Sequence, residues 1–161
     1  MTEQSNGVTL KMSADDLARA CADAMWADDQ ASQKLGMVIK HIASGVARLT
    51  MPVTKAMCNG LGSGHGGYIF TLADSAFAFA CNSHNTYAVA QHCSITYVAP
   101  AHEGDILTAS AREVERFGRN GIYDIRVTNQ DNKLIAEFRG HSRTVRGTHL
   151  PVAQNNEGEA Q

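Results

Sequence analysis

The chain has 161 residues, of which 43% are hydrophobic, and a formal net charge of −2. That length and apolar content suit a single domain that buries a core without disulfides or a metal. Neither a basic block nor a basic amphipathic helix occurs, so we expect no nucleic-acid and no membrane partner. No apolar run approaches the length of a membrane span, and the N-terminus lacks the features of a secretory signal, so we expect a cytoplasmic protein.

The first half of the chain predicts a short helix, a hairpin and a long helix. Ser13 and Asp16 have the spacing of a capping box, which starts a helix over 13–26. Two strands follow at 37–43 and 46–53, joined by a turn at Ser44 and Gly45. A glycine-rich loop then leads into an apolar helix over 67–81.

The second half predicts strands. They are expected in meander order at 88–98, 106–117, 122–128 and 134–145. The residues after Pro151 have nothing to bury and are expected to be disordered. Because the helix over 67–81 is too apolar for a surface position, the sheet must curl around it. The predicted fold class is α+β, an antiparallel sheet wrapped around a long central helix, with a short N-terminal helix.

Asp74 is the carboxylate that stands out, because it lies within this apolar helix. An unpaired charge is normally excluded from such surroundings. Catalysis would justify it, and a structural Asp that is hydrogen-bonded to a backbone amide is the alternative. On the helix face of Asp74 the other residues are small, so a thin ligand or a second backbone can lie against this face; they are Gly67, Thr71, Ala78 and Cys81.

The loop before the helix is rich in glycine between residues 60 and 67, which lets its backbone approach a ligand closely. The helix N-terminus that follows has free N–H groups that polarise a carbonyl or bind an anion. Among the histidines, His65 alone lies in this loop. Cys58 lies beside it, but no partner pattern for a nucleophile is visible. The four cysteines are widely spaced, which indicates neither a metal site nor a disulfide framework.

The stretch HGGYIFTLADSAFAFACNS and the order of elements resemble the hotdog-fold acyl-CoA thioesterases, most closely those of phenylacetate degradation. The family pattern is Asn-Gly, a short spacer, His-Gly-Gly, and then Leu-Ala-Asp within the helix. The resemblance covers about 35–145, and GIYDIRVTNQ and FRGHSR in the last strands strengthen it. It implies a single hotdog thioesterase domain in 1–161 and a homodimer, commonly paired into a homotetramer.

The resemblance also implies an active-site set: Asn59, His65, Gly66, Gly67 and Asp74. The Gly67 N–H would stabilise negative charge on the thioester oxygen, and Asp74 would be the nucleophile or the base that activates water. Asn59 would orient water or the acyl group, and His65 would brace the loop or bind the leaving thiolate. Hydrogen bonding within the loop is the alternative for both. Gly66 and Thr71 are expected to contact substrate.

Coenzyme A carries phosphates, so cationic side chains are expected at the mouth of the cleft. The candidates are Arg116, Arg119, Arg139 and Arg143. An ordinary solubilising role is the alternative for each of them. No metal, nicotinamide or flavin signature appears, so no cofactor is expected beyond the coenzyme A of the substrate.

The spacing of Gly67 and Asp74 predicts a site shared between two chains. Seven residues of helix separate them by about 10 Å along the axis. One reacting centre cannot lie within about 3 Å of both groups of the same chain. Antiparallel pairing of two such helices about a two-fold axis would bring Gly67 of one beside Asp74 of the other.

The expected activity is hydrolysis of acyl-CoA thioesters, with hydroxyphenylacetyl-CoA or a related aryl-acetyl-CoA as the substrate that the resemblance implies. One alternative is a hotdog enoyl-CoA hydratase, which needs a paired His and acid; His65 lies in the loop and not opposite Asp74. A non-catalytic acyl-CoA-binding module is the other alternative, against which the intact Asp74 argues.

Overall fold

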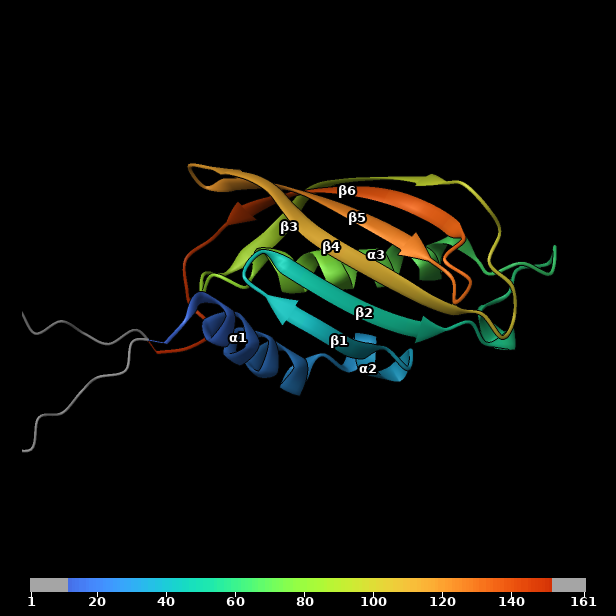
Figure 1. Cartoon of the computed structure of the whole chain (residues 1–161), viewed down its shortest axis with the longest axis horizontal. Helices are drawn as coiled ribbons and strands as arrows, with labels where there is room; N and C mark the ends of the chain where they lie inside the picture. Colours follow the sequence, from blue (N-terminus) through green and yellow to red (C-terminus); the bar gives the residue numbers. More distant parts are fainter. Residues whose placement is uncertain (1–11, 152–161) are drawn as a thin grey trace, which may run out of the picture.

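Residues 12–151 are described by a computed structural model, in which one antiparallel sheet curves around a central helix, α3 (Gly66–Cys81) (Figure 1). The strands are β1 (Val38–Ala43), β2 (Val46–Pro52), β3 (Ala88–Tyr97), β4 (Ile106–Phe117), β5 (Asn120–Thr128) and β6 (Leu134–Thr144). The sheet order is β1-β2-β4-β5-β6-β3. The remaining elements are α1 (Ala14–Asp28), α2 (Gln30–Lys34) and the 3₁₀ turn η1 (Lys55–Met57).

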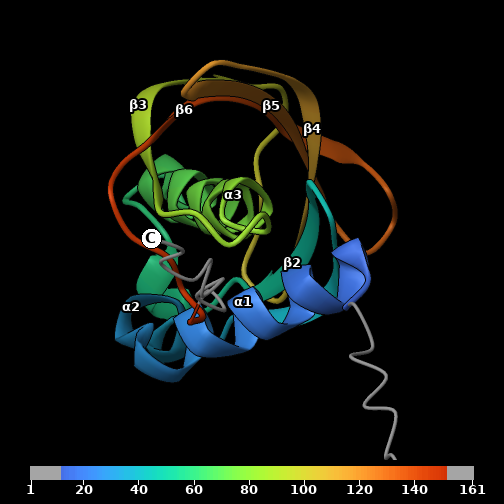
Figure 2. The ribbon, with the colours of Figure 1, turned by 90° about the vertical axis from the view of Figure 1, so that its left-hand side faces the viewer.

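Helix α3 is buried on most of its circumference because apolar side chains occur all around it. Figure 2 shows the sheet curling over α3, while α1 and α2 lie on the side that the sheet leaves open. On that side Trp26 of α1 packs against Phe79 of α3, with ring centroids 6.1 Å apart. The central helix therefore lies between the sheet and α1.

A glycine allows α3 to approach the sheet closely. The ring of Phe77 lies over Gly140 of β6, where an added Cβ would stand only 2.8 Å from the ring carbons. The same ring packs against Tyr123 of β5 and Phe138 of β6, whose ring centroids lie 5.4 and 6.1 Å away. These aromatic contacts fix the rotation of α3 and with it the direction in which Asp74 points.

The predicted elements are confirmed, and each observed end lies within two residues of the predicted one. Ser13 caps α1 by accepting a hydrogen bond from the Asp16 N–H, as the capping box predicts. Gly45 has φ +71° in the β1–β2 turn, a conformation that glycine adopts without strain. The short elements α2 and η1 were not predicted.

The predicted meander order is wrong for β3. This strand pairs with β6 at the far edge of the sheet, and β4 pairs with β2 instead. Only β4, β5 and β6 follow as a meander, because tight turns join them. From β3 at the far edge of the sheet, the segment 98–105 leads the chain back to β4, which lies beside β2. The predicted disorder after Pro151 concerns residues outside the described range.

We expect Gly140→Ala to lower the free energy of unfolding by about 1–3 kcal/mol, because the added methyl group overlaps the Phe77 ring. Gly60→Ala is the matched control, since an added Cβ there has no heavy atom within 4 Å. Its effect should stay within about 0.5 kcal/mol. Equal denaturation midpoints for the two variants would show that the Phe77 ring does not confine Gly140.

Candidate active site

The glycine-rich loop is a compact turn that Asn59 holds together. The Asn59 side-chain oxygen accepts hydrogen bonds from the N–H groups of Leu61 (2.9 Å) and Ser63 (3.3 Å). Its amide nitrogen donates to the Ser63 hydroxyl at 3.1 Å. Gly62, at φ +78°, allows the tight reversal between them. These contacts favour the alternative in which Asn59 braces the loop, and a role in orienting water stays a prediction.

His65 caps the N-terminus of α3. The Nδ1 atom of the His65 ring accepts a hydrogen bond from the Gly67 N–H at 2.9 Å. The backbone N–H of His65 donates to the Met57 carbonyl at 2.8 Å. The N–H group that is expected to contact the substrate is therefore hydrogen-bonded to an imidazole in the free protein. A ligand oxygen that binds this N–H would have to take the place of His65 Nδ1.

A cavity of about 460 Å³ opens beside this helix terminus. Its lining comes from the loop, the first turn of α3 and the end of β3; the residues are Ser63, Gly64, Gly66, Ile69, Tyr97, Val98, Ala99 and Pro100. The predicted substrate contact Gly66 is thus part of a cavity wall. Thr71 instead donates its hydroxyl to the Gly67 carbonyl one turn earlier in the helix, at 2.8 Å.

Asp74 lies half-buried on the side of α3 that faces β3. The thiol of Cys93 donates a hydrogen bond to this carboxylate, with Sγ 4.0 Å from Oδ1. Within residues 12–151 no backbone amide and no cationic side chain donates a hydrogen bond to this carboxylate. Burial raises the pKa of Asp74, and burial together with the nearby Asp74 raises the pKa of Cys93 to about 11. A structural Asp held by a backbone amide is therefore not what the fold contains.

Two of the four predicted arginines are bonded within the chain. Arg139 pairs with Asp124 on the outer face of the sheet, with Nε 2.7 Å from Oδ1, and holds the pKa of that carboxyl below its usual range. Arg119, in the β4–β5 turn, donates from Nε and Nη2 to the Thr144 carbonyl. Neither residue lies at the glycine-rich loop.

The other two arginines lie at the end of the sheet where α3 terminates. Arg116 is near the end of β4, and Arg143 is near the end of β6, where it pairs across the sheet with Asn120 and Val89. The glycine-rich loop lies at the opposite end. The structure therefore does not bring the predicted phosphate ligands to the loop of the same chain.

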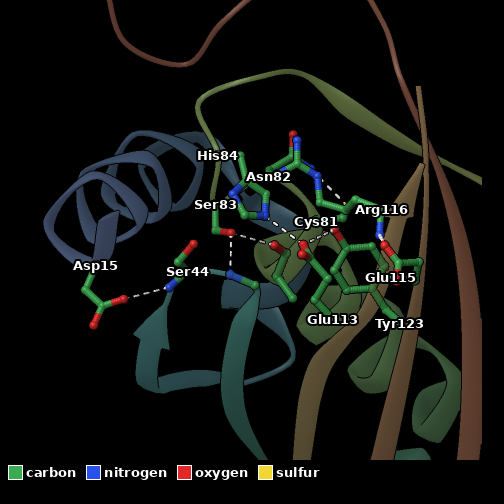
Figure 3. Close-up of polar contacts among 12 residues, drawn as sticks. Asp15, Ser44, Cys81, Asn82, Ser83, His84, Glu113, Glu115, Arg116 and Tyr123 are labelled. Carbon is green, nitrogen blue, oxygen red and sulfur yellow. Dashed lines mark hydrogen bonds and ion pairs between the residues drawn. The ribbon is translucent and has the colours of Figure 1, made fainter. Parts of the chain in front are cut away.

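Sequence reasoning missed a polar cluster at the C-terminal end of α3 (Figure 3). Glu113 Oε2 lies 2.7 Å from His84 Nε2 and accepts a hydrogen bond from the Tyr123 hydroxyl at 2.8 Å. Ser83 accepts a hydrogen bond from the Gly45 N–H at 2.8 Å. These contacts attach the end of α3 to β4, β5 and the β1–β2 turn. No motif marks them, since their members come from four separate segments.

Among residues 12–151, no three His, Cys, Asp or Glu side chains gather as ligands for a metal ion. No helix in that range is long and apolar enough to cross a bilayer. The predicted cytoplasmic location stays a prediction.

Residues 61–136, which include the end of the loop, all of α3 and Asp74, match the Thioesterase superfamily. The acyl-coenzyme A thioesterase PaaI of Escherichia coli K12 is 45% identical over 127 residues, which are 79% of this chain and 91% of that protein. The chain belongs to the thioesterase superfamily. The predicted family, hotdog fold and thioester hydrolase class are therefore confirmed.

Two solved structures are similar to this chain. The E. coli PaaI protein from the phenylacetic acid degradation operon superposes with a TM-score of 0.83 at 43% identity, covering 84% of this chain and 99% of that one. A Streptococcus mutans protein solved with bound acetyl-CoA superposes with a TM-score of 0.67 at 28% identity, covering 70% and 90%.

Proposed function

We propose that this thioesterase hydrolyses acyl-CoA, releasing the free acid and the thiol of coenzyme A. The observation that carries the proposal is Asp74, a half-buried carboxylate that no cation or backbone amide neutralises in the described chain. A charge kept in such a place at a cost in stability is typical of catalytic groups. The name of the 45% identical relative and the acetyl-CoA bound to the S. mutans protein support coenzyme A as the carrier.

In the proposed reaction the thioester oxygen accepts a hydrogen bond from the Gly67 N–H and so takes the place of His65 Nδ1. Charge that develops on this oxygen is then stabilised by a donor fixed at a helix N-terminus. Asp74 either attacks the carbonyl carbon or removes a proton from an attacking water. Water supplies the new oxygen of the acid in both routes, and the thiolate of coenzyme A leaves with a proton.

Two chains are needed to bring these groups together. Gly67 and Asp74 lie on the unbroken helix α3, about 10 Å apart along its axis, and the cavity at the loop extends along α3 only to Ile69. We propose a homodimer in which each site combines the Gly67 N–H of one chain with Asp74 of the other. Further pairing into a homotetramer stays a prediction.

The edge strand β3 supports this arrangement. Among residues 12–151 this strand pairs only with β6, which leaves its other edge open, and the strand carries exposed apolar side chains, including Val89 and Tyr97, each 49% exposed. An open edge of this kind favours a second chain. The Asp74 contact on β3, Cys93, lies four residues before Tyr97, which contacts Gly66. We propose a two-fold axis between these points, which would set each Asp74 beside the loop of the partner.

We expect Asp74→Asn to lower kcat by at least about a hundredfold, the usual scale for a lost acid–base group. Thiol release from acyl-CoA measures it, and binding of an unreactive acyl-CoA analogue should persist. Turnover near the wild-type rate would refute the role of Asp74. If neither protein released thiol while both bound the analogue, a non-catalytic acyl-CoA-binding module would replace the proposal.

Stability against pH is the control for this variant. Burial raises the pKa of Asp74, so the folded protein binds that proton more tightly than the unfolded chain does. Wild-type stability from this group is therefore present at acid pH and lost as the pH rises through the raised value. Asn carries no charge, so the variant should melt at an equal or higher temperature at pH 7, with a difference that shrinks toward acid pH.

For the acyl group we propose hydroxyphenylacetyl or a related aryl-acetyl. The relative with 43% identity comes from a phenylacetic acid degradation operon, and the cavity at the loop combines apolar walls with the Ser63 hydroxyl. We expect kcat/KM for hydroxyphenylacetyl-CoA to exceed that for palmitoyl-CoA by about tenfold or more. Thiol release with both substrates tests this, and a clear preference for palmitoyl-CoA would contradict it.

Mixing two inactive variants tests the shared site. We expect Asn59→Ala, which releases the loop, and Asp74→Asn to be inactive alone. A mixed dimer then has one doubly damaged and one intact site, so random mixing recovers about a quarter of the wild-type activity. If mass spectrometry confirmed mixed dimers and no activity returned, both residues would belong to one site from one chain.

A further inference from the structure

The strand β3 contacts the helix terminus through a tyrosine. The Tyr97 hydroxyl donates a hydrogen bond to the Gly66 carbonyl oxygen at 2.9 Å. The ring lies against Gly66 itself: a Cβ added there would stand 2.9 Å from Cζ and 3.0 Å from the hydroxyl oxygen. Tyr97 and Gly66 also line the same cavity at the loop. No sequence motif announces this contact, since 31 residues separate its partners.

The carbonyl that Tyr97 contacts and the N–H of Gly67 belong to one peptide group. In a trans peptide these two groups lie in one plane and point in opposite directions. A hydrogen bond at the Gly66 oxygen therefore fixes the direction of the Gly67 N–H. It also polarises the peptide, which makes that N–H a stronger donor.

The free protein holds this peptide at both ends, by the Tyr97 hydroxyl at the oxygen and by His65 Nδ1 at the N–H. When a substrate oxygen displaces the imidazole, the tyrosine contact remains, together with the helical bonding of α3, whose first residue is Gly66. We propose that Tyr97 is a positioning residue that orients and polarises the Gly66–Gly67 peptide for the developing oxyanion. This inference rests on the proposed thioesterase reaction.

The consequence is kinetic. The negative charge on the thioester oxygen is larger in the transition state than in the bound substrate, so a better donor acts mainly on kcat. Loss of one hydrogen bond to the peptide should then lower kcat by about three- to tenfold and leave KM unchanged. A tyrosine that served only to fill space would not separate the two constants in this way.

Tyr97→Phe is the direct test, because it removes the hydroxyl and keeps the ring. Tyr87→Phe is the matched control: Tyr87 is 40% exposed, just before the start of β3, and its ring packs against Gly147 at the other end of the sheet. We expect kcat to fall about three- to tenfold in Tyr97→Phe at constant KM. We expect no change in Tyr87→Phe.

A second readout observes the peptide without catalysis. Gly66–Gly67 is the sole Gly–Gly pair in the sequence, so glycine labelled with carbonyl ¹³C and amide ¹⁵N gives one directly coupled signal. In Tyr97→Phe, loss of the hydrogen bond should move the Gly66 carbonyl resonance upfield. In Tyr87→Phe the same resonance should stay where it is in the wild type. An unmoved signal in Tyr97→Phe, or wild-type kcat, would overturn the inference.

The two proposals fail separately. If wild-type protein released thiol and Asp74→Asn did not, the proposed function would stand whatever Tyr97→Phe did. If wild-type protein released no thiol, the proposed function would fall, and with it the assignment of Tyr97 to catalysis.

A Gly66→Ala variant completes a double-mutant cycle with Tyr97→Phe. The added methyl group displaces the Tyr97 ring, so Tyr97→Phe should lower kcat no further in that background. Additive losses would contradict the contact.

Discussion

Helix α3 has apolar side chains on nearly all its faces, and its burial under the curved sheet is the interaction on which the rest of the structure depends. Burial of the helix places its N-terminus at one end of the sheet, where the glycine-rich loop meets β3. It also takes Asp74 partly out of water, which raises the pKa of that carboxyl. The chemistry and the core thus depend on the same packing.

The positions of helices and strands could be predicted because each has a local signal. Ser13 and Asp16 mark the start of α1, and the alternation of the strands is short-range. Asp74 could be singled out for the same reason, since a carboxylate among apolar helix residues is visible in the sequence. The place of β3 in the sheet could not, because pairing with β6 depends on the path around α3.

The details of the site depend on contacts that a sequence does not display. Asn59 was a candidate for substrate contact, yet its side chain is bonded to Leu61 and Ser63 within the loop. The hydrogen bond from the Gly67 N–H to His65 Nδ1 likewise depends on the side-chain rotamer of His65, which the sequence does not display. The arginines illustrate the limit of composition: charge alone marks Arg139, but its partner Asp124 lies on the neighbouring strand β5.

The contact between Tyr97 and Gly66 has an evolutionary consequence. Gly66 has helical backbone angles, which any residue can adopt, so its backbone does not require glycine. The ring of Tyr97 favours glycine there, because in its present position it occupies the space of a Cβ. Selection at position 66 is therefore conditional on position 97. Among descendants of this chain, a side chain at 66 should become acceptable only after the aromatic ring at 97 has been lost or has moved.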